Sequence, residues 1–233
     1  MIQPPLTAEP VFHLGPVPIT QPVLTTWAIM ALMVLFSVLL SRRLKQRPGR
    51  TQTVMELITG ALDQQIGDVV QSDPAPYRAL IGTIFLFVFV ANWSGALPGV
   101  EPPTAHLETD AALALIVFGA TLYHGVRVNG VVGYLKTFAD PHWVMIPLNL
   151  VEQITRTFSL FIRLFGNVMS GVFIIAIMLS LAGFLVPIPL MALDLLTGAV
   201  QAYIFAILGC VFIGAAVSER GDAEKNSRER SAA

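Results

Sequence analysis

The stretch Val144–Val186, VMIPLNLVEQITRTFSLFIRLFGNVMSGVFIIAIMLSLAGFLV, decides the fold of this chain. Its only charged side chains are Glu152, Arg156 and Arg163. An apolar run this long is suited to a hydrocarbon layer about 30 Å thick. As one helix its 43 residues would extend about 65 Å at 1.5 Å per residue. We therefore expect it to be broken, or to lie steeply tilted against a large partner.

The rest of the chain is equally apolar, with 55% hydrophobic and 12% charged residues among 233, a balance unsuited to a water-exposed surface. Backbone groups in lipid find hydrogen bonds only within helices, so the sequence predicts an all-α membrane protein with five membrane helices. The last two form a long tilted hairpin closed by Pro187 and Pro189. The expected parts are an outer N-terminal segment 1–21, one membrane domain 22–218 and a charged cytoplasmic tail 219–233. The other predicted spans are Pro22–Leu40, Ala79–Leu97, Ala111–Val126 and Leu190–Val217.

The segment Thr51–Val70 differs from these spans. Its apolar residues recur at helical spacing, whereas Glu56, Asp63 and Asp68 lie between them. This pattern predicts an amphipathic helix lying in the membrane interface.

The distribution of basic residues predicts the orientation. Lys and Arg gather at Arg42–Arg50, Arg78, Arg127 with Lys136, and the tail from Arg220, while the intervening loops hold none. Basic loops stay on the cytoplasmic side. Five crossings then place the N-terminus outside and the C-terminus in the cytoplasm.

Composition also excludes several classes of function. A net charge of −1 with no clustered basic face argues against nucleic acid. The single cysteine, Cys210, offers no metal-ligand spacing, and no phosphate-binding loop is present. We expect no cofactor, no metal site and no independent active site.

Arg163 is out of place in an apolar helix, because an arginine at mid-depth costs about 3 kcal/mol or more. Successive residues turn by about 100°, so the other polar residues of the segment share its face. A polar stripe of this kind can hold helices together through side-chain hydrogen bonds, and an arginine can extend its charged group to the membrane surface. Both alternatives to a functional role stay open. The stripe consists of Glu152, Arg156, Ser159, Arg163, Asn167 and Ser170.

Few carboxylates of this chain could pair with Arg163. Glu152 lies three turns away, and Asp194 lies on the last helix, where it shares a face with Gly198 and Gln201. Neither is placed to reach Arg163. We therefore expect a carboxylate supplied by another subunit.

Two motifs carry a family resemblance. Arg163-Leu164-Phe165-Gly166-Asn167, preceded by Ser159-Leu160 and followed by Gly171, resembles the signature of the a subunit of F-type ATP synthases. Gln201-Ala202-Tyr203-Ile204-Phe205 resembles that family's motif on the final helix. Supporting matches, within a likeness that runs from about Thr51 to Glu219, are Asn92, Gly95, Pro98 and Pro103-Thr104-Ala105.

The resemblance implies an ion-conducting stator subunit in a bacterial inner membrane, beside a rotating ring of c subunits that each carry one carboxylate. The b-type peripheral stalk and the rest of the F1Fo complex would be further partners. Arg163 would be a fixed charge, since arginine stays protonated, and the transported ion would be H⁺ or Na⁺. Gln201 would hydrogen-bond near Arg163.

The expected ion path has two half-channels, which flank Arg163 and Asn167. The inner one would comprise Glu152, Arg156 and Ser159. The outer one would comprise Asn92, Ser170 and Asp194, with His106, Glu108 and Asp110 at its mouth.

The chain departs from the family at two positions. Val172 stands where many relatives have a titratable residue, and Asp194 stands where many have a histidine. A single aspartate would then replace a two-residue relay.

Two other classes of protein were weighed. A secondary transporter usually shows internal repeats and broken helices, and neither is visible. An intramembrane protease needs a nucleophile with its base, and Ser170 and Asp194 lack the accompanying motifs.

Overall fold

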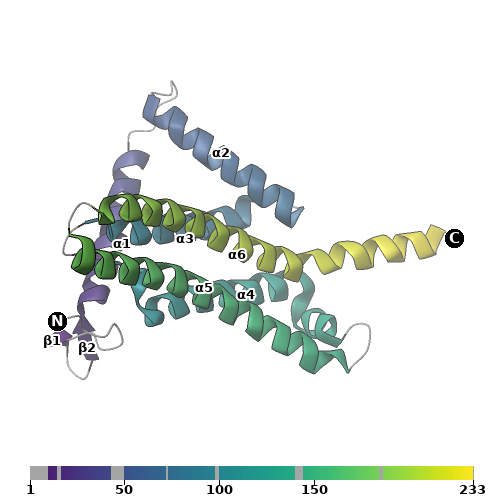
Figure 1. Ribbon diagram of the computed structural model, residues 1–233. Coiled ribbons are helices and arrows are strands. Elements are labelled where there is room, and N and C mark those ends of the chain that lie inside the picture. Colours follow the sequence, from purple (N-terminus) through teal and green to yellow (C-terminus); the bar gives the residue numbers. More distant parts are fainter. Residues whose placement is uncertain are drawn as a thin grey trace.

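The computed structural model describes residues 10–14, 17–42, 50–71, 73–97, 100–139, 144–183 and 186–232, and its helices dominate the molecule (Figure 1). Five of these helices are long and apolar enough to cross a membrane. The predicted fold class is therefore confirmed, and the chain is a multi-pass membrane protein. The elements are β1 Pro10–Leu14, β2 Val17–Thr20, α1 Gln21–Ser41, α2 Arg50–Val70, α3 Ala75–Ser94, the 3-10 turn η1 Pro103–Ala105, α4 Leu107–Ala139, α5 Met145–Ala182 and α6 Pro187–Ala232.

A small β-hairpin precedes the helices, which the sequence analysis did not predict. Strands β1 and β2 pair antiparallel, with Phe12 opposite Ile19 and Leu14 opposite Val17. β-Branched residues such as Val17 and Ile19 favour extended backbone. The predicted outer segment 1–21 thus contains this hairpin, while residues 1–9 and 15–16 lie outside the described part of the chain.

Helices α3, α4, α5 and α6 pack around one apolar core. Its fully buried members include Val88 of α3, Val117 of α4, Leu164 of α5 and Phe205 of α6. Because lipid is as apolar as this core, close packing and polar contacts hold such helices together. The core therefore fixes which turns of the four helices lie level with one another.

The two ends of this bundle are fixed by polar contacts between distant segments. At the end where α5 connects to α6, called here the hairpin end, Asn92 donates a hydrogen bond to the Gly198 carbonyl at 2.9 Å. At the opposite tail end, Asn129 donates to the Ala216 carbonyl at 2.8 Å. The basic residues Arg78 and Arg127 belong to the tail end, where the rings of Tyr77 and His124 are in contact at an angle of 59°, with centroids 4.8 Å apart.

Helix α5 is unbroken from Met145 to Ala182. Its 38 residues extend about 57 Å at 1.5 Å per residue, far more than a hydrocarbon layer is thick. Of the two expected alternatives, a broken helix is therefore wrong. Figure 1 shows α5 and α6 side by side at their connection and diverging toward the tail end. Helix α6 continues to Ala232, so the predicted tail continues the last span as helix.

Helix α4 contains a kink that the sequence analysis missed. Gly130 has φ 73° and ψ 162°, inside a segment that is otherwise helical. This backbone conformation is essentially restricted to glycine. The chain turns back there, so a Cβ added at Gly125 would lie 2.9 Å from Cδ2 of Tyr134.

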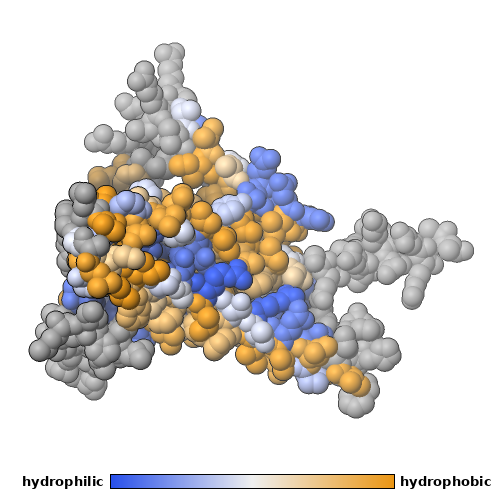
Figure 2. All heavy atoms as spheres, in the orientation of Figure 1, coloured by the Kyte–Doolittle hydropathy of each residue, from blue (hydrophilic) through white to orange (hydrophobic). Residues whose placement is uncertain are grey.

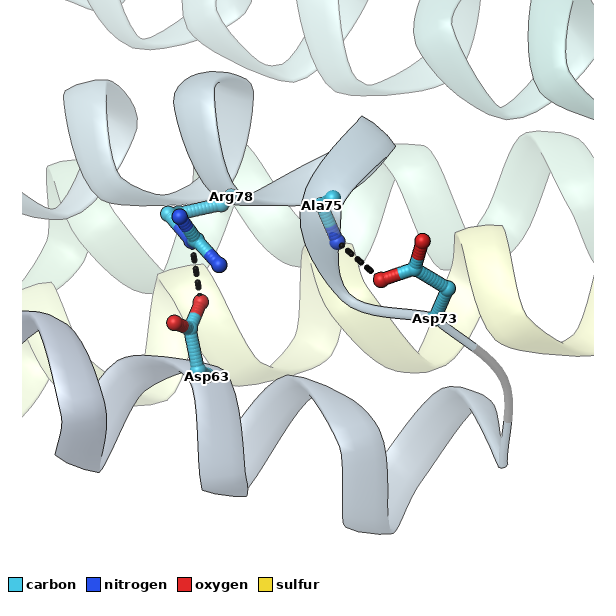
Figure 3. Close-up of polar contacts among 4 residues, drawn as sticks. All are labelled: Asp63, Asp73, Ala75 and Arg78. Atoms are coloured by element: carbon cyan, nitrogen blue, oxygen red, sulfur yellow. Dashed lines mark hydrogen bonds and ion pairs between the residues drawn. The ribbon is translucent and has the colours of Figure 1, made fainter.

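Helix α2 lies apart from the spans and contacts α3 and α6. An ion pair between Asp63 of α2 and Arg78 of α3 fastens it, as Figure 3 shows. In the same view the backbone N–H of Ala75 donates to Asp73 Oδ1 at 3.0 Å, at the start of α3. In α2, Leu57 is exposed, whereas Ile66 and Val70 on another face of the helix are buried. This arrangement fits the predicted amphipathic helix.

Candidate functional site

Arg163 lies close to the midpoint of α5, since residues 145–162 precede it and residues 164–182 follow it. Leu160, Leu164 and Val168, spaced by four, are buried in the bundle. That face holds α5 against its neighbours and turns Arg163 outward, where it is exposed. Its neighbour Ile162 is also exposed, so the surroundings of the guanidinium are apolar.

Arg163 forms no hydrogen bond and no ion pair with any residue that the structure describes. The ion pairs found there are Asp63–Arg78, Glu101–His106 and Glu152–Arg156. An unpaired cation in hydrocarbon is strongly unfavourable. The expectation that its anion comes from outside this chain is therefore consistent with the structure.

A groove lies on the tail side of Arg163, between α5 and α6. Its volume is about 600 Å³, and Glu152, Arg156, Ser159 and Arg163 line it together with Leu208 and Phe212 of α6. Glu152 pairs with Arg156 one turn later, and the Arg156 guanidinium lies 5.8 Å from the Phe212 ring centroid. The structure thus brings together the three residues predicted for the inner half-channel.

Asp194 lies on the other side of Arg163, toward the hairpin end. It is half-buried and packs directly against Gly171 of α5, because a Cβ added at Gly171 would collide with its carboxylate. Ser170, the residue before Gly171, is exposed and donates to the Asn167 carbonyl at 2.9 Å. Asp194 therefore meets α5 two turns from Arg163.

Asn92 belongs to the same end of the bundle. It donates to Gly198, one turn after Asp194, and accepts a hydrogen bond from Thr104 Oγ1 at 2.7 Å. A Cβ at Gly198 would lie 3.0 Å from the Asn92 Cβ. Glycine at position 198 thus lets α3 approach α6 closely enough for this bond.

The three residues expected at the outer mouth have different environments. Glu108 is exposed, and His106 Nε2 lies 3.5 Å from Glu101 Oε2. Asp110, in contrast, has 0% exposure. Asp110 is therefore buried among the helices and does not lie at a solvent-exposed entrance with Glu108.

Asn167 and Gln201 flank the region of Arg163 on α5 and α6. Gln201 is buried, and its Nε2 and the Nδ2 of Asn167 have no hydrogen-bond partner among the described residues. Neither the Gln201 amide nitrogen nor Arg163 forms a hydrogen bond in the described part of the chain, so the hydrogen bond predicted for Gln201 near Arg163 is not seen there.

Figure 2 shows hydrophilic residues in a row over α5, set in a mostly hydrophobic surface. Arg163 lies between two groups of polar residues, the groove at Glu152, Arg156 and Ser159 toward the tail end and the group with Asp194 toward the hairpin end. Among the described residues no group of three or more His, Cys, Asp or Glu side chains could hold a metal ion. The arrangement is suited to passing a small cation in two stages, with a positive charge between them.

Residues 23–214 match the family model described as ATP synthase A chain. The chain belongs to this family. It is therefore an ion-translocating membrane subunit of the F1Fo ATP synthase complex and carries no independent catalytic site.

Curated relatives match this chain over most of its length. "ATP synthase subunit a 2" of Bradyrhizobium sp. is 55% identical over 213 residues, covering 91% of this chain and 96% of that relative. "ATP synthase subunit a 1" of Chlorobaculum parvum is 46% identical over 200 residues, covering 85% and 88%. "ATP synthase subunit a" of Albidiferax ferrireducens is 44% identical over 197 residues, covering 84% and 85%.

Sequence reasoning missed some residues that build the site. Thr104 entered only as part of a motif, yet its buried hydroxyl orients Asn92. Trp93 donates its indole N–H to the Leu195 carbonyl at 3.1 Å and so ties α3 to α6 beside Asp194. The burial of Asp110 had a signal, because Ala114, Val117 and Thr121 share its helical face and are all apolar or small.

Proposed function

We propose that Arg163 is the fixed positive charge that separates two half-channels and couples the flow of H⁺ or Na⁺ to the rotation of a c-subunit ring. The observation that carries this proposal is an exposed arginine at the midpoint of a long apolar helix, with no carboxylate partner in the described chain. A ring of subunits that each bring one carboxylate past Arg163 would supply the missing anion.

The chemistry follows from the side chain. A guanidinium keeps its proton at any accessible pH, so it cannot carry the ion itself and repels cations that would pass directly between the half-channels. A facing carboxyl is favoured in its ionised form and gives up its ion there. It reloads after it has moved past, so transport requires rotation.

The two polar groups of residues are the half-channels. The inner one is the groove at Glu152, Arg156 and Ser159, and the outer one contains Ser170 and Asp194. Asn92 and Thr104 support the outer one through their hydrogen bonds. Asn167 and Gln201 lie between the outer path and Arg163.

The orientation of the chain in the membrane, its domain bounds and its partners are also part of this proposal. The tail end, with the exposed Arg78 and Arg127, faces the cytoplasm, and the hairpin end faces outward across a bacterial inner membrane. The membrane domain is 22–218, with the outer segment 1–21 and the tail 219–233 on either side. The peripheral stalk of b-type subunits holds the chain against the torque of the ring.

The test is ATP-driven ion uptake by membrane vesicles that contain the assembled complex. We expect Arg163→Ala to abolish both acidification and sodium uptake, because the barrier between the half-channels is lost. Arg78→Ala is the matched control, since that exposed arginine pairs with Asp63 alone among the described residues and its loss is expected to leave uptake intact. Normal uptake by an assembled Arg163→Ala complex would refute the proposal.

A further inference from the structure

Three side chains have buried polar atoms without a hydrogen-bond partner among the described residues. These atoms are both carboxylate oxygens of Asp110 on α4, Nδ2 of the half-buried Asn167 on α5 and Nε2 of Gln201 on α6. Such atoms are rare in proteins, because leaving one unpaired costs about 1–3 kcal/mol. Three on neighbouring helices call for a common explanation.

The three groups lie in a layer about one helical turn thick. Val117 of α4 packs against Gly209 of α6, so Asp110, seven residues before Val117, is nearly level with Gln201, eight residues before Gly209. Asp194 packs against Gly171 of α5, so Asn167, four residues before Gly171, lies about one turn from the level of Gln201 toward the hairpin end. Packed helix axes are about 8–10 Å apart, so side chains at these positions can reach a common space.

Donors and acceptors in this layer are complementary. The Asp110 carboxylate offers only acceptors when ionised, and the unpaired atoms of Asn167 and Gln201 are donors. Water accepts from an amide and donates to a carboxylate, and a buried water needs about 2–4 polar partners. The layer provides that number.

This polar layer lies between Asp194, in the proposed outer half-channel, and Arg163. Asn92, which borders it from α3, is already paired with Gly198 and Thr104. Asp194 lies two turns from Gln201 toward the hairpin end, and Arg163 lies one turn from Asn167 toward the tail end. An ion that passes from Asp194 to a carboxylate facing Arg163 must cross this level.

We infer that Asp110, Asn167 and Gln201 enclose a hydrated layer, in which Asp110 is a second ion-exchanging carboxylate of the outer half-channel. The inference rests on the proposed function and deepens it. Asp110 takes up the ion from the Asp194 side and releases it through bridging water toward the ring, so each transfer returns the carboxylate to its starting state. The exposed Val172 of α5 offers no group for this step.

The test is Asp110→Asn in the assembled complex, which keeps the shape of the side chain but removes its ability to exchange an ion. Proton transfer by a positioned side chain contributes about 100-fold or more. Because water can bypass one group, we expect passive ion conduction through vesicles stripped of F1 to fall about tenfold. Asp68→Asn is the control, since Asp68 is an exposed aspartate of α2 outside both half-channels; its conduction is expected to stay unchanged.

The outcome separates this inference from the proposed function. If Arg163→Ala abolishes ATP-driven uptake while Asp110→Asn conducts like the unmodified complex, the inference is wrong and the proposed function stands. If Arg163→Ala pumps normally, the proposed function itself is wrong.

Silver ions provide a second readout, which a purely structural aspartate would not produce. In a Cys210→Ala background, Asp110→Cys is expected to make conduction sensitive to Ag⁺ because the layer is hydrated. Leu113→Cys, one turn away in the apolar core, is expected to stay insensitive. Insensitivity of Asp110→Cys would mean that the layer is dry and would overturn the inference, including where Asp110→Asn does not assemble.

Discussion

The contact between Asn92 and Thr104 gives a sharp test of the packing at the hairpin end. Thr104 Oγ1 donates to Asn92 Oδ1 at 2.7 Å, and Asn92 Nδ2 donates to the Gly198 carbonyl at 2.9 Å. Both side chains are buried, with exposures of 8% for Asn92 and 0% for Thr104. The two variants that break these bonds are Asn92→Ala and Thr104→Val.

The magnitudes follow from the bonds that each variant removes. Asn92→Ala loses two hydrogen bonds of about 1 kcal/mol each and leaves a buried hydroxyl unpaired, so we expect the free energy of unfolding to fall by about 2–4 kcal/mol. Thr104→Val loses one bond and leaves Asn92 Oδ1 unpaired, which costs about 1–3 kcal/mol. In the double variant neither residue keeps a polar atom that the other substitution has left unpaired. The free energy of unfolding therefore falls by less than the sum of the two single losses. Between membrane helices this coupling averages about 0.6 kcal/mol and reaches about 1.7.

The assay is equilibrium unfolding of the two single variants and the double variant in detergent micelles, followed by circular dichroism. Thr83→Val is the control, because among the described residues the Thr83 hydroxyl donates only to the Ala79 carbonyl, one turn earlier in the same helix. Its effect is expected to add to that of Asn92→Ala. Additivity of Asn92→Ala and Thr104→Val within about 0.3 kcal/mol would refute the reasoning.

The remaining predictions concern two glycines and a tryptophan. Gly171→Ala is expected to push Asp194 off α5 and to slow passive ion conduction, measured in vesicles stripped of F1; unchanged conduction would remove Asp194 from the path. Gly130→Ala is expected to lower the free energy of unfolding by about 1–3 kcal/mol, because φ at that position is positive. Gly119→Ala, with nothing within 4 Å of its added Cβ, is expected to be neutral or stabilising in the same measurement, and equal losses would contradict the argument. Trp93→Phe removes one exposed hydrogen bond and is expected to cost at most about 1.5 kcal/mol in the same unfolding assay; a larger loss would show that the indole does more than donate this bond.

The sequence predicted the helical architecture because hydrocarbon leaves a chain few alternatives. The predicted spans Pro22–Leu40 and Ala79–Leu97 correspond to α1 and α3 within about four residues at each end. The predicted span Leu190–Val217 is the apolar part of α6, which continues as helix to Ala232. Arg163 stood out for the same reason, because an unpaired charge in an apolar membrane helix is energetically costly. These features depend on composition and residue spacing, which can be read directly from the amino-acid sequence.

The features that the sequence did not reveal depend on how helices meet. Glu108 and Asp110 are two acidic residues in one turn, and only the packing of α4 shows that Asp110 is buried and Glu108 is exposed. Gly130 was one glycine among 18, and its role is set by a backbone angle. The hydrogen bond expected for Gln201 near Arg163 is not seen among the described residues, because the direction of a side chain on a helix does not determine its partner.

The interpretation as a whole depends on what Arg163 faces in the assembled complex. The most direct measurement is an experimental structure of the intact complex in a lipid membrane, in which the carboxylate nearest to the Arg163 guanidinium is identified. We expect a carboxylate of a c subunit, within about 4–6 Å of the guanidinium as the ring rotates past. An Arg163 that reaches lipid headgroups, or that pairs with a carboxylate of its own chain, would contradict it.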